Sequence, residues 1–183
     1  YAWAVARRQA SNSSHYGATM LEWAAEAGCA DLVREGLPSW SDEEFAAHAS
    51  NLPLSYWTSF DTLSQITHAK LFRGFRQQEV PILIDLSPDV SKRITEMTVF
   101  SIDDAGLFSR IAGAVASTGV NIVGARIATC SDGSVLDVFI LQTNGNDAID
   151  DSALLERLEK NVEKAITGSF RTNSYDTFEY WDS

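Results

Sequence analysis

The stretch Ser101-Ile-Asp-Asp-Ala-Gly-Leu-Phe-Ser-Arg-Ile111, followed by Gly119-Val-Asn-Ile122, decides the fold of this chain. The alternating residues that precede it are typical of a strand, and residues 103–106 have the composition of a tight turn. Apolar residues then recur at helical spacing, which predicts a helix over 106–118. Because Thr118 and Gly119 are typical of a helix end, a second turn and a new strand are expected to follow.

Gly106 is the residue of this turn on which a binding function would depend. A residue without Cβ lets the backbone come close to a molecule that lies over the turn. The free N–H groups at the start of the helix point at the same place and favour a carboxylate. The turn therefore suits a ligand with an α-carboxylate, such as an amino acid. The alternative is an ordinary strand-to-helix turn with nothing bound.

The segment Asp104-Ala-Gly-Leu-Phe108, with Gly119-Val-Asn-Ile122, resembles the signature of ACT domains, which are small amino-acid-sensing modules. Together with the pattern over 94–139 and the upstream segment Ser55-Tyr-Trp-Thr-Ser-Phe-Asp61, it is similar to the bifunctional PII uridylyltransferase/uridylyl-removing enzymes, a family of bacterial nitrogen sensors. The resemblance covers about residues 37–168 and indicates a carboxy-terminal fragment with the first ACT domain. One departure is Ala105, which stands where that family usually has proline.

This resemblance implies a regulatory module that senses glutamine and takes part in the control of nitrogen metabolism. It implies the PII signalling protein as a partner of the parent enzyme, whose transferase and uridylyl-removing activities are expected to need Mg²⁺. A second ACT domain, or a second copy of the chain, would complete the ligand site. The alternative function is a ligand-free, ACT-like assembly module that mediates dimerisation or contact between domains.

The predicted ligand-binding residues lie on two turns. The resemblance implies that backbone groups of the first turn and the side chain of Asn121 hold the amino acid at an interface between two ACT domains. An amide side chain offers both a donor and an acceptor, which suits an α-amino acid, although Asn121 is equally well explained as a turn residue. The predicted set is Asp104, Ala105, Gly106, Leu107, Phe108, Asn121 and Ile122.

No catalytic motif is visible in the sequence. Nucleotidyl transfer would need a Gly-Ser turn before two metal-binding aspartates, and the acidic residues 147–151 are better explained as the N-terminal region of a helix. The three histidines His15, His48 and His68 are far apart, and none is followed by aspartate. We therefore expect this chain to have no catalytic residues, no metal site and no cofactor of its own.

Composition excludes some classes of partner. The chain has 183 residues, 45% of them hydrophobic, and a formal net charge of −11. Such an acidic chain lacks the clustered Lys and Arg that bind nucleic acid or an anionic membrane surface. It also has no apolar run long enough to cross a bilayer. A cytoplasmic location is the expectation.

The periodicity of the sequence changes along the chain and predicts three segments. Residues 1–78 are expected to be helical and, by the resemblance, to be the end of a hydrolase domain and a linker. Ser41-Asp-Glu-Glu44 is a capping-box pattern there, and Asp61 is expected to cap a longer helix. Residues 79–168 form the predicted ACT domain, and residues 169–183 a tail or linker.

The second segment predicts the order strand, strand, helix, strand, strand, helix. The leading strand should turn at Ser87-Pro-Asp-Val90 and pair with a strand at 94–102. The Asp132-Gly133 turn predicts another hairpin, between strands at 120–130 and 134–143. The last helix is expected to end at Gly168.

The fold class predicted by this order is α+β. A standard ACT domain runs strand, helix, strand, strand, helix, strand, so the leading strand here should take the place of the usual final one. The result is a permuted ferredoxin-like ββαββα domain whose antiparallel sheet carries its helices on one face. The other face is expected to be exposed or to pair with another ACT domain.

Overall fold

The computed structural model describes residues 28, 30–78 and 80–173, which fall into two units. The first unit comprises the residues up to Gly74 together with Ala128–Gly133, and the second comprises Phe75–Ile127 and the residues from Ser134 onward. The predictions for residues 1–27 and for the tail at 174–183 lie outside the described residues.

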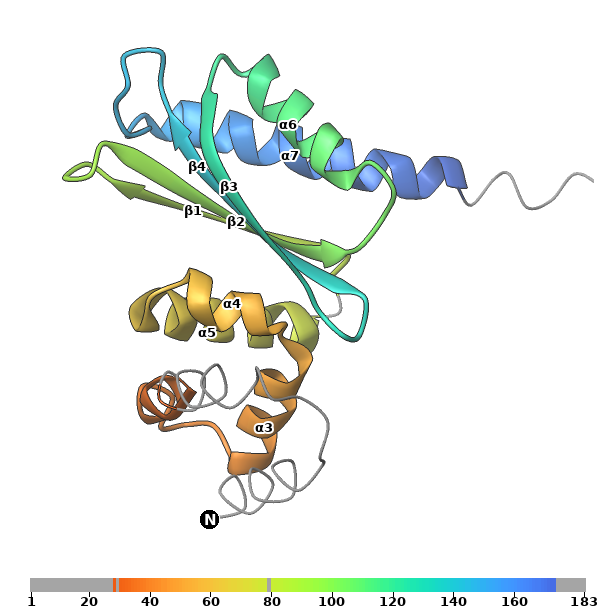
Figure 1. The fold of residues 1–183 in the computed structure, drawn as a ribbon. Helices are drawn as coiled ribbons and strands as arrows, with labels where there is room; N and C mark the ends of the chain where they lie inside the picture. The colour runs from red at the N-terminus through yellow and green to blue at the C-terminus, as the bar shows by residue number, and fades with distance from the viewer. Residues whose placement is uncertain (1–27, 29, 79, 174–183) are drawn as a thin grey trace, which may run out of the picture. The chain divides into compact units, whose positions relative to one another are not determined.

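The first unit is helical, as predicted for the residues that are described. It contains α3 (Asp42–Asn51), α4 (Leu54–Ser59) and most of α5 (Thr62–Gln78) (Figure 1). The predicted capping box begins α3: the Glu44 amide donates to Ser41 Oγ at 3.1 Å, and the Ser41 amide donates to Glu44 Oε2 at 2.8 Å. Asp61 caps α5 by accepting a hydrogen bond from the Ser64 amide. Both caps are confirmed.

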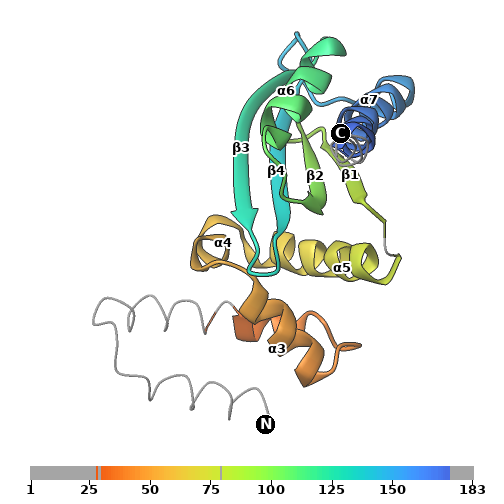
Figure 2. The same ribbon diagram turned by 90° about the vertical axis from the view of Figure 1, so that its right-hand side faces the viewer.

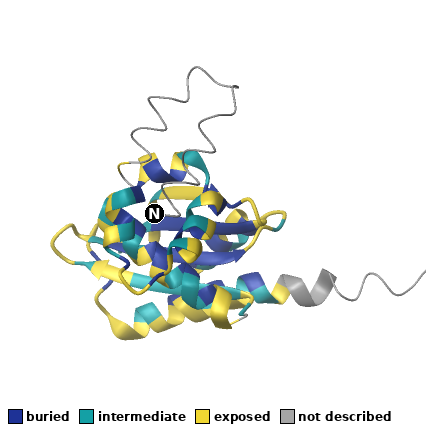
Figure 3. Ribbon diagram, turned by 90° about the horizontal axis from the view of Figure 1, so that it is seen from below, coloured by how far each residue is buried: buried dark blue, intermediate teal, exposed yellow. Residues whose placement is uncertain are grey.

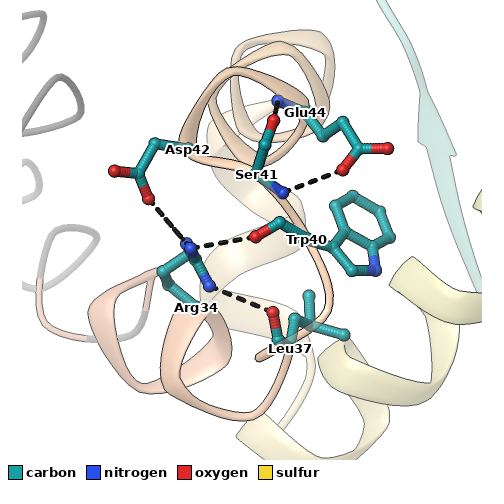
Figure 4. Close-up of polar contacts among 6 residues, drawn as sticks. All are labelled: Arg34, Leu37, Trp40, Ser41, Asp42 and Glu44. Atoms are coloured by element: carbon teal, nitrogen blue, oxygen red, sulfur yellow. Dashed lines mark hydrogen bonds and ion pairs between the residues drawn. The ribbon is translucent and has the colours of Figure 1, made fainter.

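One arginine fastens the loop that leads into α3 (Figure 4). Arg34 donates from Nη1 to the Leu37 carbonyl and from Nη2 to the Trp40 carbonyl, each at 3.0 Å. It also contacts Asp42 Oδ1 through Nε at 3.1 Å and Nη2 at 2.9 Å, which holds the pKa of that carboxyl below its ordinary value. The four bonds fix the loop before the first residue of α3.

The second unit is built on a four-stranded antiparallel sheet with the order β1-β2-β4-β3. Its strands are β1 (Ile82–Asp89), β2 (Ile94–Ile102), β3 (Asn121–Thr129) and β4 (Ser134–Gln142). The leading strand β1 lies beside β2, with Ile84 opposite Val99, as the permuted order predicts. The chain is therefore an α+β protein with an ACT-like ferredoxin fold.

Two predicted boundaries in this unit are wrong. The predicted turn at Ser87–Val90 is strand, because β1 continues to Asp89 and Pro88 lies opposite Thr95. An edge strand tolerates proline because the missing N–H has no ladder partner to lose on its outer side. The last helix, α7 (Ser152–Asn173), continues past Gly168 because nothing in the backbone forces a glycine to leave the helical conformation.

Helices α6 (Leu107–Ser117) and α7 cover the same face of the sheet (Figures 1 and 2). The apolar sides of the two helices and alternate residues of the strands form one core. Each Å² of apolar surface that this core removes from water stabilises the fold by about 25 cal/mol. The members of this core are Met97, Val99, Leu107, Ile111, Val115, Val120, Val135, Phe139, Leu141, Ile149, Leu158, Val162 and Ile166.

The opposite face of the sheet also carries apolar side chains, and its exposure or its pairing with another ACT domain stays a prediction. Phe100, Leu136 and Val138 lie on that face and are at most 1% exposed. The ring of Phe75 stacks on Phe100 with centroids 6.1 Å apart. Most residues of β2 and β4 are buried, and Figure 3 colours the described residues by their burial.

We predict that Arg34→Ala lowers the free energy of unfolding by about 1–3 kcal/mol, because the Leu37 and Trp40 carbonyls lose a charged donor. Urea denaturation followed by tryptophan fluorescence measures the change. The matched control is Lys70→Ala on the exposed side of α5, which should change stability by less than about 0.5 kcal/mol. Equal stability of the two variants would show that Arg34 does not hold the loop.

Candidate functional site

The predicted turn between β2 and α6 has the geometry that a glycine permits. Gly106 is the N-cap residue of α6, with φ 76° and ψ 10°, in the left-handed region. The Leu107 amide donates to the Asp104 carbonyl at 3.0 Å, which closes the turn. A Cβ at Gly106 would meet only Arg110 Nη1, at 3.7 Å, so the space over the turn is open.

Arg110, which sequence reasoning did not include in the site, clamps this turn from one helical turn further along. Its Nη2 contacts Asp104 Oδ2 at 2.6 Å, and its Nη1 donates to the Ala105 carbonyl at 2.7 Å. Its Nε is buried and has no hydrogen-bond partner among the described residues. The carboxylate of Asp104 is thus engaged within the turn, while the guanidinium keeps further N–H donors.

The first turn of α6 offers further donors. Within the described part of the chain, the amides of Leu107 and Arg110 are bonded, but those of Phe108 and Ser109 have no partner, and no side chain caps the helix. The helix dipole places a partial positive charge at the same position. The turn can therefore bind an anionic group such as a carboxylate.

The apolar residues of the predicted set divide into two kinds. Leu107 is 4% exposed and belongs to the core, so only its backbone is available for binding. Phe108 is 42% exposed, and its ring stacks on Phe139 of β4 with centroids 5.5 Å apart. Phe108 is the apolar side chain of this turn that a ligand can reach.

Asn121 and Ile122 lie at the other end of α6. They begin β3, which starts directly after this helix of 11 residues, roughly 16 Å long at 1.5 Å per residue. The Asn121 side chain donates to Asn144 Oδ1 at 3.2 Å, and Ile122 packs against the core. One small ligand cannot contact both turns of the same chain, so the predicted use of both needs a neighbouring domain or copy.

Sequence reasoning left Asp137 out of the ligand site and favoured a cross-strand ion pair with Arg126 for it. It lies on β4 opposite Val99, between Val135 and Phe139 on the face that the helices cover, and it is 3% exposed. In the part of the chain that the structure describes, its Oδ1 has no hydrogen-bond partner. Burial, followed by the repulsion of Asp103, raises the pKa of Asp137 to about 6. A single aspartate at an inward position of an apolar strand was the available signal.

Metal and membrane sites can be addressed for the described residues only. No group of His, Cys, Asp and Glu among them is arranged to hold a metal ion. The Mg²⁺ that the resemblance implies is therefore not assigned to these residues. Likewise, none of the helices of the described segments is long and apolar enough to span a membrane.

Several bacterial proteins named bifunctional uridylyltransferase/uridylyl-removing enzyme are similar to this chain. The Rhodospirillum rubrum protein is 40% identical over 114 residues, which are 62% of this chain and 12% of that protein. The Azospirillum brasilense protein is 36% identical over 140 residues, 76% of this chain and 15% of that protein. The Gluconobacter oxydans protein is 37% identical over 139 residues, which are 75% of this chain and 15% of that protein. No family model matches the chain.

The fold and the turn define an α+β protein of the ACT-like ferredoxin class with a left-handed glycine turn before α6. The similarity in sequence confirms the predicted resemblance, because this chain matches part of several proteins named bifunctional uridylyltransferase/uridylyl-removing enzyme. The chain spans 12–15% of the length of the curated relatives named above.

Gly106→Ala should lower the free energy of unfolding by about 1 kcal/mol, because alanine is strained at positive φ. The matched control, Gly113→Ala in the middle of α6, meets nothing within 4 Å and should raise stability by about 0.5–1 kcal/mol. Thermal unfolding, followed by far-UV circular dichroism, shows whether each substitution lowers or raises the stability. A stabilising Gly106→Ala would mean that the left-handed turn is not required.

Asp137→Asn should change how stability depends on pH. The pKa of Asp137 rises from an ordinary 3.8 to about 6 on folding, so the folded state binds more protons between these values. The free energy of unfolding of the wild type therefore falls as pH rises through this window. The variant avoids this loss and should be more stable by up to roughly 3 kcal/mol at pH 8, with little difference near pH 4.

Urea denaturation at several pH values, followed by circular dichroism, measures this effect. The control is Asp150→Asn, at an exposed carboxyl before α7, which should follow the wild type at every pH. If Asp137→Asn and the wild type keep a constant difference from pH 4 to pH 8, the carboxyl of Asp137 does not titrate near 6.

Proposed function

We propose that this chain is a regulatory, amino-acid-sensing module of a PII uridylyltransferase/uridylyl-removing enzyme, and that glutamine is its ligand. Residues 1–78 would be the end of the hydrolase domain and a linker, residues 79–168 the ACT domain and residues 169–183 a tail or linker. The parent enzyme would act on the PII signalling protein in the cytoplasm. Any Mg²⁺ would belong to catalytic domains outside this chain.

The observation that carries the proposal is the open turn at the start of α6 in a chain of this family. Two unpartnered amides offer donors to one carboxylate, the helix dipole favours its negative charge, and the guanidinium of Arg110 lies at the same turn. Gly106 leaves room for the ligand to approach the backbone, and Phe108 provides an apolar contact at the rim. Asn121 of a neighbouring domain or copy would bind the polar part of the ligand.

Regulation in this proposal is a difference in affinity between two states of the parent enzyme. Glutamine would bind more tightly to the state that removes uridylyl groups than to the state that adds them. A typical coupling free energy of about 1–3 kcal/mol would change the balance of activities about 5- to 150-fold. This chain supplies the sensing site and leaves both reactions to the other domains.

The second candidate function is a ligand-free assembly module. Strand β3 is an edge strand of nine residues in which Val123 is 53% and Ile127 is 54% exposed. An exposed apolar edge of this kind is a ready partner for a strand or sheet of another domain. This function needs the edge but not the open turn, so the two candidates differ in whether an amino acid binds.

Calorimetric titration of the chain with glutamine and the other amino acids tests the proposal. Glutamine should bind, and Arg110→Met should weaken it by at least about tenfold because a charged hydrogen bond to the carboxylate is lost. Gly106→Val and Asn121→Ala should also weaken binding. The matched control, Lys164→Met on the exposed side of α7, should bind like the wild type.

The outcomes separate the two candidate functions. Binding of glutamine that survives Arg110→Met, Gly106→Val and Asn121→Ala in well-folded variants would place the site elsewhere in the chain. If no amino acid binds at millimolar concentration, while sedimentation shows a dimer that a charge at Val123 disrupts, the assembly function replaces the sensing function.

A further inference from the structure

The carboxyl group of Asp137 is buried beneath the first turn of α6. The Oδ1 atom of Asp137 has no hydrogen-bond partner among the described residues, although the residue is only 3% exposed. An uncompensated buried carboxylate is costly, and native proteins rarely keep one without a partner. Its position matters because the neighbouring helix turn is the candidate anion site.

The pairing of β2 with β4 determines where this carboxylate lies. Asp137 is opposite Val99, and Phe139 is opposite Met97, so all four residues project from the face that α6 covers. Phe139, two residues along β4, stacks on Phe108 in the first turn of α6. Asp137 is therefore under the start of this helix rather than under its end.

The other acidic side chain of the turn is already engaged. Asp104 is bound to Arg110 at 2.6 Å, so it is neutralised within the turn. Asp103 lies close enough to Asp137 to raise its pKa. The start of α6 thus combines donors for an anion with a negative region that attracts a cation.

We propose that Asp137 binds the ammonium group of the amino acid whose carboxylate is held by the first turn of α6. This inference rests on the proposed sensing function and names the part of the ligand that the site selects. A zwitterion satisfies both sets of groups at once, since its ammonium donates to Oδ1 while its carboxylate accepts from the amides of Phe108 and Ser109. An analogue without the ammonium leaves the buried carboxylate unpaired.

Asp137 is 3% exposed, so a ligand can reach it only if a neighbouring side chain moves, and we assign this movement to Phe108. The ring of Phe108 lies on Phe139 and is 42% exposed, so it has solvent on one side into which it can rotate. Rotation of a side chain of this kind needs no change in the backbone of α6. The ligand would then replace ring contacts near β4 with a charge-assisted hydrogen bond.

The test compares two ligands that differ only in the ammonium group: glutamine and 4-carbamoylbutanoate, its des-amino analogue. Calorimetry with the 183-residue chain should give the wild type a preference for glutamine of at least about tenfold. Asp137→Asn should bind glutamine more weakly than the wild type does, but it should bind the analogue at least as tightly as the wild type does. Most of the preference is then lost. The matched control Asp150→Asn should keep the preference of the wild type.

The ratio of the two affinities distinguishes recognition from a structural effect. If Asp137→Asn weakens both ligands equally, or leaves glutamine binding unchanged, the inference is overturned while the sensing function stands. If the wild type binds glutamine and its analogue equally well, the ammonium is not recognised and the inference is also overturned. If the wild type binds neither, the sensing function fails and the inference fails with it.

Discussion

The antiparallel pairing of β2 with β4 is the constraint on which the second unit depends. Most residues of both strands are buried, and their register places Met97 opposite Phe139 and Val99 opposite Asp137. A slip of one residue would turn every side chain of one strand to the other face and remove the surface on which α6 and α7 pack. The positions of Phe139 and Asp137 under α6 follow from the same register.

The turn that follows β2 is held in place by its own glycine and by one arginine of α6. Gly106 takes the left-handed conformation, and Arg110 fastens the residues before it through Asp104 and the Ala105 carbonyl. Alanine at position 105 leaves the backbone freer than the usual proline of the family would. A proline would restrict the backbone of the turn from within it. Here the contacts of Arg110, which lies on α6, provide part of that restriction.

The site and the core make opposite demands on Asp137. An apolar residue at this position of β4 would suit the core, whereas the carboxylate destabilises the folded chain above its raised pKa. Residues that break a local rule in this way are commonly found where function requires them. The buried carboxylate is therefore the feature of the second unit that packing alone does not explain.

Much of the fold was predictable because it depends on patterns among residues that are close in the sequence. The capping box at Ser41, the cap at Asp61 and the start of α6 after Gly106 depend on neighbouring residues, and all three are observed. The boundaries that failed depend on context instead. Pro88 fits inside a strand because that strand is at the edge of the sheet, and Gly168 stays helical because a glycine permits a helix end without requiring one.

The sequence by itself determined the order of the elements, the permuted sheet and the turn that forms the candidate site, since periodicity and turn chemistry act over a few residues. Only the tertiary structure decided which side chains meet there. It buried Asp137 under the start of α6 and stacked Phe108 on Phe139. These relations depend on strand register and on helix packing across the chain, which a local pattern does not encode.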